Sequence, residues 1–137
     1  MTPREHLELL CDPGTFMAIR SGVRSDTSVA EGDGVVAGAG AIAGRPVHCY
    51  AQDPAHMGGS LGASHAESIV RVMRLAGEAG TPIVGLVESG GARLQDGHEA
   101  LAGYGRIFRA SVELSRRIAV SNSFGFGGHN AVLCISA

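Results

Sequence analysis

The sequence predicts an α/β fold. Short apolar runs typical of strands alternate with two longer segments of helical periodicity, in the order strand, strand, helix, strand, helix, strand. The 21 glycines cluster at the turns predicted between these segments and show no collagen-like period. A chain of 137 residues can enclose a single hydrophobic core, so we expect one domain at most.

The first half of the chain is expected to hold a short helix followed by strands. Asp12, Pro13 and Gly14 form a turn that ends the helix, while Gly44 and Arg45 join two strands. The polar, glycine-containing segment 21–34 is expected to be an exposed loop. The elements expected here are a helix over residues 3–10 and strands over residues 16–19, 35–42 and 46–52.

A helix over residues 64–79 has the strongest pattern. Ser64 and Glu67 have the spacing of a capping box, and Arg71 stands four residues after Glu67, where the two can pair. Gly77 and Gly80 are expected to end this helix. The apolar side of this helix is expected to pack on a strand over residues 82–87, and it consists of Ile69, Val72, Met73 and Ala76.

A second helix is expected over residues 97–116. Asp96 and Glu99 form a weaker capping pair at its start. Its apolar residues repeat at helical spacing and are expected to face the core; they are Leu101, Tyr104, Ile107, Phe108 and Val112.

The composition excludes several classes of function. A net charge of −2 gives no electrostatic basis for binding nucleic acid or an anionic membrane. No apolar run could span a bilayer, and the N-terminal MTPREHLELL lacks a signal-peptide core, so a cytoplasmic location is expected. All 11 basic residues are arginine, so the chain has no lysine that could carry biotin or form a Schiff base.

Cysteine and histidine usage predicts no metal site. Cys11, Cys49 and Cys134 lie far apart without a C-x-x-C pair, and we expect them to be reduced and mostly buried. His48 alternates with apolar neighbours and is expected to be a hydrogen-bonded structural residue. Three further histidines are not spaced as the ligands of a metal site would be; they are His56, His65 and His98.

Several motifs together carry a family resemblance. They are ESGGARLQDG at residues 88–97, LAGYGRIF at 101–108, GGSLG at 58–62 and GDGVVAGAGAIAGRPVHCYAQD at 32–53. Over residues 3–114 the chain resembles the biotin-dependent acyl-CoA carboxyltransferases: the β subunits of propionyl-CoA and acetyl-CoA carboxylases, and methylmalonyl-CoA decarboxylases. The resemblance implies a crotonase-like (ClpP/crotonase) fold of repeated β-β-α units. It would be truncated here, because the subunits of this family are several times longer.

The resemblance also implies a CoA-binding turn. Gly90, Gly91, Ala92 and Arg93 match the family's GGAR turn, in which the backbone lines the CoA site and the arginine can reach a phosphate. Considered without the resemblance, the glycines would merely turn the chain, and Arg93 would pair with a carboxylate such as Asp96.

A second glycine loop is implied in the same site. Gly58, Gly59 and Ser60 match the family's FGGS loop, although Met57 stands where an aromatic or aliphatic residue is usual. A flexible turn before the helix over residues 64–79 explains these residues equally well.

The family's reaction explains why glycines would lie at the ends of strands. A proton leaves the carbon beside a thioester, and the resulting enolate takes up CO2 released from carboxybiotin. Backbone N–H groups at a glycine turn can approach the charged thioester oxygen, and one such donor contributes about 3 kcal/mol. In the family the biotin ureido group takes the proton. The implied partners are acyl-CoA, a biotin carrier or biotin carboxylase subunit that brings biotin in trans, and further subunits in a homo- or hetero-oligomer.

The last twenty residues depart from the family pattern. Where carboxyltransferases have a GPCAGGAVYSP-like turn with oxyanion donors, this chain has SNSFGFGGHN at residues 121–130, which resembles a glycine-rich segment of β-ketoacyl synthases. We therefore divide the chain into a partial carboxyltransferase N-terminal domain, residues 1–117, and a ketosynthase-like tail, residues 118–137. The tail over residues 121–137 is expected to form strand, glycine loop and strand.

Two accounts of the tail remain open. Either the chain joins two gene fragments, which the ten-residue match favours, or Gly127 and Gly128 take the place of the family's paired glycines as catalytic oxyanion donors. The corresponding functions are an incomplete and inactive carboxyltransferase component, a non-catalytic remnant that associates with full-length subunits, and a fragment of a ketosynthase fusion in fatty-acid or polyketide synthesis.

Overall fold

The computed structural model describes residues 1–22 and 33–115, together with the backbone of residues 119–124 and 130–135. The fold is α/β, as predicted. Its six-stranded sheet keeps the strands in chain order. The strands are β1 (Met17–Ile19), β2 (Val35–Ile42), β3 (Arg45–Gln52), β4 (Ile83–Val87), β5 (Ala119–Phe124) and β6 (Asn130–Ile135). β3, β4 and β5 run parallel, and the outer pairs are antiparallel.

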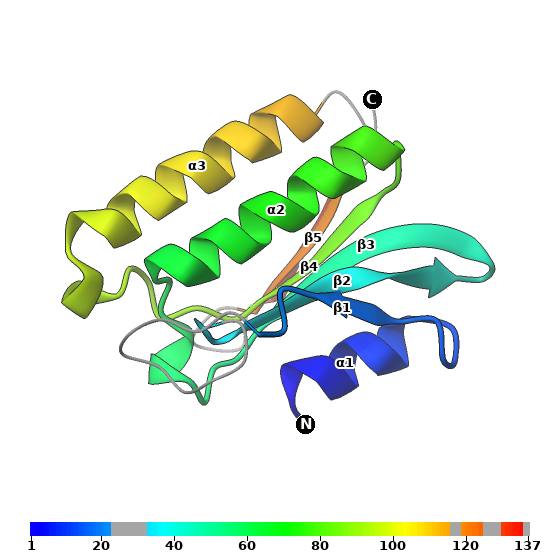
Figure 1. Ribbon diagram of the computed structural model, residues 1–137, viewed down its shortest axis with the longest axis horizontal. Helices are drawn as coiled ribbons and strands as arrows, with labels where there is room; N and C mark the ends of the chain where they lie inside the picture. Colours follow the sequence, from blue (N-terminus) through cyan, green and yellow to red (C-terminus); the bar gives the residue numbers. More distant parts are fainter. Residues whose placement is uncertain (23–32, 116–118, 125–129, 136–137) are drawn as a thin grey trace.

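Helices cover both faces of this sheet (Figure 1). The long helices α2 (Ala63–Ala79) and α3 (His98–Leu114) lie side by side on one face, and the short helix α1 (Pro3–Leu10) lies on the other. α2 connects β3 to β4 and α3 connects β4 to β5, since parallel neighbours need a long crossover. The predicted positions of all three helices are confirmed to within a few residues.

The face under α1 holds a small core. α1 begins with a capping box in which the Thr2 hydroxyl accepts from the Glu5 N–H, and the Glu5 carboxylate accepts from the Thr2 N–H. Cys11 and Cys49 are free and buried, as expected, and burial raises the pKa of the Cys49 thiol to about 12. The core residues on this face are Leu7, Cys11, Val36, Val47, Cys49 and Ala51.

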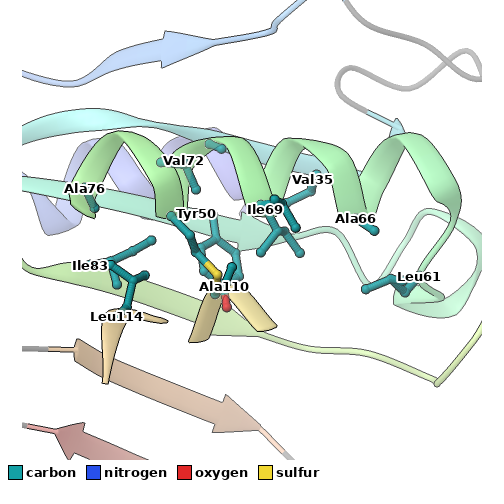
Figure 2. Close-up of a cluster of buried hydrophobic side chains, with 13 residues drawn as sticks. Val35, Tyr50, Leu61, Ala66, Ile69, Val72, Ala76, Ile83, Ala110 and Leu114 are labelled. Atoms are coloured by element: carbon teal, nitrogen blue, oxygen red, sulfur yellow. The ribbon is translucent and has the colours of Figure 1, made fainter. Parts of the chain in front are cut away.

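The larger core lies between the sheet and the two long helices (Figure 2). α2 packs over β2 and β3, and Ile83 of β4 joins the same cluster. The expected burial of Ile69, Val72 and Met73 is confirmed, with exposed fractions of 2%, 0% and 6%. Tyr50 fits beneath this layer only because its partner across β3 and β4 is Gly85, where a Cβ would lie 2.5 Å from the ring.

The starts of the long helices differ from the sequence prediction. Ser64 and Glu67 form no capping box, because α2 begins after Gly62 and no side chain of its own caps it. Glu67 pairs with Arg20 at 3.1 Å rather than with Arg71. α3 likewise begins after Gly97 without a side-chain cap, because Asp96 is directed to the start of α2 instead.

The prediction of which α3 residues face the core is also wrong in part. Leu101, Phe108 and Val112 are 65%, 66% and 69% exposed. The residues that α3 buries are mostly small, which lets the helix approach α2 closely; they are Ala100, Gly103, Ala110 and Leu114. None of the helices in the described part of the chain is long and apolar enough to cross a membrane.

The tail adds the last two strands to the sheet. β5 lies parallel to β4, and β6 returns antiparallel to β5, with Ala119 paired to Ile135 and Phe124 paired to Asn130. The two strands predicted for the tail are therefore confirmed. Gly127 and Gly128 lie outside the described residues.

Val72→Asp tests the core under α2. Val72 has no exposed surface, so an unpaired carboxylate there should cost at least about 3 kcal/mol and unfold the domain. Thermal melting followed by circular dichroism measures the effect. Val112→Asp places the same group at a 69% exposed position of α3 and should leave the melting temperature nearly unchanged. Equal melting of the two variants would show that this side of α2 is not core.

Candidate functional site

The structure brings the two predicted glycine loops together. Gly58 belongs to the 3-10 turn η2 (Met57–Gly59), and its carbonyl accepts from the Gly90 N–H at 2.9 Å. Leu61 N–H donates to the Gly91 carbonyl at 2.8 Å, and Arg93 N–H donates back to the Leu61 carbonyl at 2.9 Å. Segments some 30 residues apart in sequence thus form one backbone-bonded unit, with Leu61 and Ala92 as an isolated parallel bridge.

Glycine is required at the points of contact between the loops. Gly59 has φ +69, and a Cβ there would lie 2.1 Å from the Glu88 carbonyl oxygen. A Cβ on Gly90 would lie 2.8 Å from the Gly58 carbonyl oxygen. Gly91 has φ +107 with open space around it, so its requirement is conformational only. The close approach of the two backbones explains why both loops need glycines.

The joined loops lie at the carboxyl ends of β3 and β4. Ligands of α/β sheets commonly bind outside the carboxyl ends of parallel strands. Gly58 and Gly90 are exposed, while Ser60, Gly91 and Ala92 are half-buried. The loops therefore present main chain, with little side-chain cover, at this end of the sheet.

Arg93 does not face solvent. Its residue exposure is 1%, and its Nη1 donates to both carboxylate oxygens of Asp33, at 2.8 and 2.9 Å. Its Nη2 donates to the Ser60 carbonyl at 3.1 Å, and the Asp96 carboxylate lies 3.9 Å from Nη1. This differs from the expectation that Arg93 reaches a phosphate. The side chain is enclosed by an internal ion pair, of which Asp96 is only the secondary partner.

The start of α2 is built around the same group. A Cβ on Gly62 would lie 2.4 Å from Arg93 Nη1 and 2.6 Å from Asp96 Oδ2, so only glycine leaves room. Asp96 Oδ2 accepts from the Ala63 N–H at 3.1 Å and supplies the cap that α2 lacks in its own sequence.

A buried histidine extends this network into the sheet. His65 Nδ1 donates to the Asp33 carbonyl at 3.2 Å, and Gln52 Nε2 donates to His65 Nε2 at 2.9 Å. Gln52 Oε1 in turn accepts from the Glu88 N–H at 3.1 Å, next to the GGAR turn. Burial, followed by the charge of Arg93, lowers the pKa of His65 to about 4, so the ring is neutral at pH 7.

Sequence reasoning missed Asp33, His65 and Gln52. Asp33 falls in the segment expected to be an exposed loop, yet it is completely buried, and His56 Nε2 lies 3.6 Å from its carboxylate. Asp33 and Arg93 are 60 residues apart, and no local pattern relates them. His48 has the structural hydrogen bond expected of it, to the Thr81 hydroxyl. Across the described ranges, no three His, Cys, Asp or Glu side chains are grouped to hold a metal ion.

The fold and this site define a class of protein. It is an α/β protein in which two glycine loops, bonded to each other through their own N–H and carbonyl groups and stabilised from inside by a buried ion pair, lie at the carboxyl ends of parallel strands. A ligand can approach this main chain closely because the loops carry little side-chain cover, although the N–H groups of Ser60, Gly90 and Gly91 already donate within the chain.

Comparison with known proteins places the chain in a family. The model of the carboxyl transferase domain matches residues 1–122. The mouse propionyl-CoA carboxylase beta chain is 43% identical over 124 residues, and methylmalonyl-CoA decarboxylase subunit alpha of Veillonella parvula is 47% identical over 115. The chain belongs to the carboxyl transferase domain family.

Solved structures agree with this assignment. The crystal structure of transcarboxylase 12S, with methylmalonyl-coenzyme A and methylmalonic acid bound, matches with a TM-score of 0.87 and 39% identity over 91% of this chain. A Pseudomonas malonate decarboxylase hetero-tetramer matches with a TM-score of 0.82 and 32% identity over 88% of this chain. The predicted crotonase-like fold is confirmed. The chain covers 23% of the two relatives named above and 26% of the 12S chain, so it corresponds to a part of each.

Asp33→Asn tests the buried ion pair. Arg93 would remain buried with a neutral partner, and breaking such a pair costs about 3 kcal/mol or more. Urea denaturation at pH 7 measures the loss. Glu113→Gln breaks the exposed pair of Arg109 and Glu113, whose side chains are 84% and 62% exposed, and should cost less than about 0.5 kcal/mol. Similar losses in both variants would mean that the buried pair contributes no more than a surface contact.

Proposed function

We propose that the chain is a carboxyltransferase component of an acyl-CoA carboxylase, holding part of the site and inactive by itself. In the complete reaction, a carboxyl group would pass from carboxybiotin to acetyl-CoA or propionyl-CoA. The observation that carries the proposal is the pair of glycine loops joined at the carboxyl ends of β3 and β4, in a chain matched by the carboxyl transferase model. A cytoplasmic location belongs to the same proposal.

The joined loops would hold the CoA part of the substrate. Gly58, Gly59 and Ser60 would line one side, and Gly90, Gly91 and Ala92 the other. Glycine lets a ligand approach this backbone closely, while the N–H groups of Ser60, Gly90 and Gly91, which donate within the chain, hold the two loops in shape. Arg93 would act as a positioning residue, because its guanidinium already binds Asp33 and the Ser60 carbonyl beneath the loops.

Biotin would have to arrive on another protein. The chain contains no lysine, and biotin is attached through a lysine side chain, so the residues present fit only a carrier that acts in trans. When bound nearby, carboxybiotin would supply CO2 and its freed ureido group would take the substrate proton. The contribution of this chain would be limited to binding and orienting the CoA moiety.

The tail is the reason to expect inactivity. β6 pairs antiparallel with β5, and among the described residues no helix N-terminus follows β5 to polarise a thioester oxygen. Gly127 and Gly128 would be the remaining candidates for oxyanion donors. A non-catalytic remnant that associates with full-length subunits is the second candidate, which the lack of a helix after β5 among the described residues also fits.

Gly91→Ala tests CoA binding at the joined loops. Gly91 has φ +107 and nothing within 4 Å of a Cβ, so the change strains only the GGAR turn. We expect calorimetric titration with CoA to show at least about tenfold weaker binding, because a residue with a side chain at this φ costs on the order of 1–3 kcal/mol unless the turn moves.

Gly44→Ala is the matched control. Gly44 has φ +73 and equally open surroundings, but it lies in the turn between β2 and β3. Its CoA affinity should equal that of the wild type. Equal affinity in both variants, or no measurable binding by the wild-type chain, would remove the loops from the CoA site.

The activity of the isolated chain is tested by carboxylation. We expect no incorporation of labelled bicarbonate into propionyl-CoA when this chain is added to biotin carboxylase, biotin carrier protein and ATP. No helix begins after β5 among the residues that the structure describes, and one donor at a helix end contributes about 3 kcal/mol. Turnover above the background without this chain would refute inactivity, and Gly127→Val with Gly128→Val would then show whether these glycines supply the donors.

A further inference from the structure

The hydrogen bonds around His65 allow only one arrangement of protons. The Asp33 carbonyl can only accept, so His65 Nδ1 carries a proton and donates to it at 3.2 Å. In the neutral ring Nε2 has no proton, and it accepts from the side-chain nitrogen of Gln52 at 2.9 Å. Gln52 Oε1 is then left to accept from the Glu88 N–H at 3.1 Å. The orientation of the Gln52 amide therefore follows from the protonation state of His65.

This relay and the buried ion pair hold the GGAR turn from its two ends. Glu88, just before the turn, is held by Gln52, and Arg93, at its end, is held by the Asp33 carboxylate. Both connections start from Asp33, since its carboxylate binds Arg93 and its carbonyl fixes the ring of His65. His65 has no exposed surface and Gln52 is 5% exposed, so water has little access to replace the bonds of the relay.

A second proton on His65 is incompatible with this arrangement. The charged ring donates from both nitrogens, so its Nε2–H would face the side-chain NH2 of Gln52. The amide would have to turn over and offer its oxygen to the ring, and its NH2 would then face the Glu88 N–H. Two donors cannot bond to each other, so the Glu88 N–H would lose its acceptor.

The groups around His65 keep the ring neutral at pH 7. Burial, followed by the charge of Arg93, lowers its pKa from 6.5 to about 4. The Asp33 carboxylate and carbonyl favour the charged ring, and His56, in the first loop, disfavours it. Because the pKa in the folded chain lies below that of a free histidine, the relay is complete at pH 7 and is lost as the pH falls through about 4.

We propose that CoA binding at the GGAR turn depends on the protonation of His65: the neutral ring orients Gln52 to hold Glu88, and a second proton releases this end of the turn and weakens binding. The inference rests on the proposed function, because CoA is the ligand assigned to the turn. Bound CoA must in return favour the neutral ring, since coupling between two sites is reciprocal. Gln52 and His65 act here as positioning residues, beneath the loops.

Nuclear magnetic resonance and hydrogen exchange test the relay without CoA. At pH 7 the neutral ring of His65 should carry its proton on Nδ1, and the Glu88 N–H should be protected from exchange. Below about pH 4 this protection should fall about tenfold while circular dichroism shows the fold intact. His48, which bonds the Thr81 hydroxyl from the same strand as Gln52, is the control and should titrate without changing the protection of Glu88.

Gln52→Glu separates His65 from the other groups that take up protons in acid. A carboxylate can accept from the Glu88 N–H and from a charged His65 together, so the ring should become charged at a higher pH than in the wild type, with Glu88 still protected. If protonation of the Asp33 carboxylate released the turn instead, the protection of Glu88 would be lost at the same pH in both proteins, and the inference would be wrong.

Calorimetric titration at pH 7 connects the relay to CoA. Gln52→Leu removes the acceptor of the Glu88 N–H and should bind CoA at least about tenfold more weakly than the wild type. His48→Leu removes a hydrogen bond elsewhere in β3 and should bind as the wild type does. Wild-type affinity in Gln52→Leu would overturn this inference alone, whereas a wild-type chain that binds no CoA would overturn the proposed function as well.

Discussion

The buried ion pair between Asp33 and Arg93 is the interaction on which the site depends. One carboxylate and one guanidinium, neither exposed, connect the segment just before β2, the loop at Ser60, the start of α2 and the GGAR turn. Two charges in the interior cost free energy unless their hydrogen bonds are satisfied, and here the surroundings satisfy them. Gly62 leaves the space that Arg93 fills, and Asp96, held near Arg93, caps α2. Loop position, helix start and buried charge are therefore determined together.

In this arrangement the polar side chains form the interior of the site and the main chain forms its surface. The polar side chains face inward: His65 is neutral, Gln52 bridges it to the Glu88 backbone, and Arg93 is enclosed. What faces outward at the ends of β3 and β4 is the backbone of two glycine loops. The hydrogen bonds within the loops and the network behind them hold this backbone in one arrangement. Removal of one of these buried side chains would therefore change the position of the glycine loops, even though the side chain itself does not reach the surface.

The second half of the chain shows how the same sheet continues beyond the site. β5 extends the parallel core next to β4, and β6 then closes the sheet with an antiparallel edge. α3 buries small residues against α2 and leaves its larger ones outside. In an isolated domain this apolar surface costs solubility, so a covering partner is favoured on physical grounds. The 12S chain matched by this fold is several times longer, and its study describes a hexamer assembly.

The sequence by itself determined the order of elements, because the period of apolar residues is a local property. The helix over residues 3–10, the hairpin at Gly44 and the apolar side of α2 could all be predicted from near neighbours. The motifs around Gly58 and Gly90 are also local, but the requirement for glycine at both places comes from the contact between the two backbones, which is a long-range feature. Tertiary structure decided the rest. Asp33 is 60 residues from Arg93, Asp96 caps a helix that begins 33 residues earlier, and Phe108 is exposed despite a core-like spacing. Long-range partners override local capping and periodicity because buried charge and close packing outweigh the few tenths of a kcal/mol of a local contact.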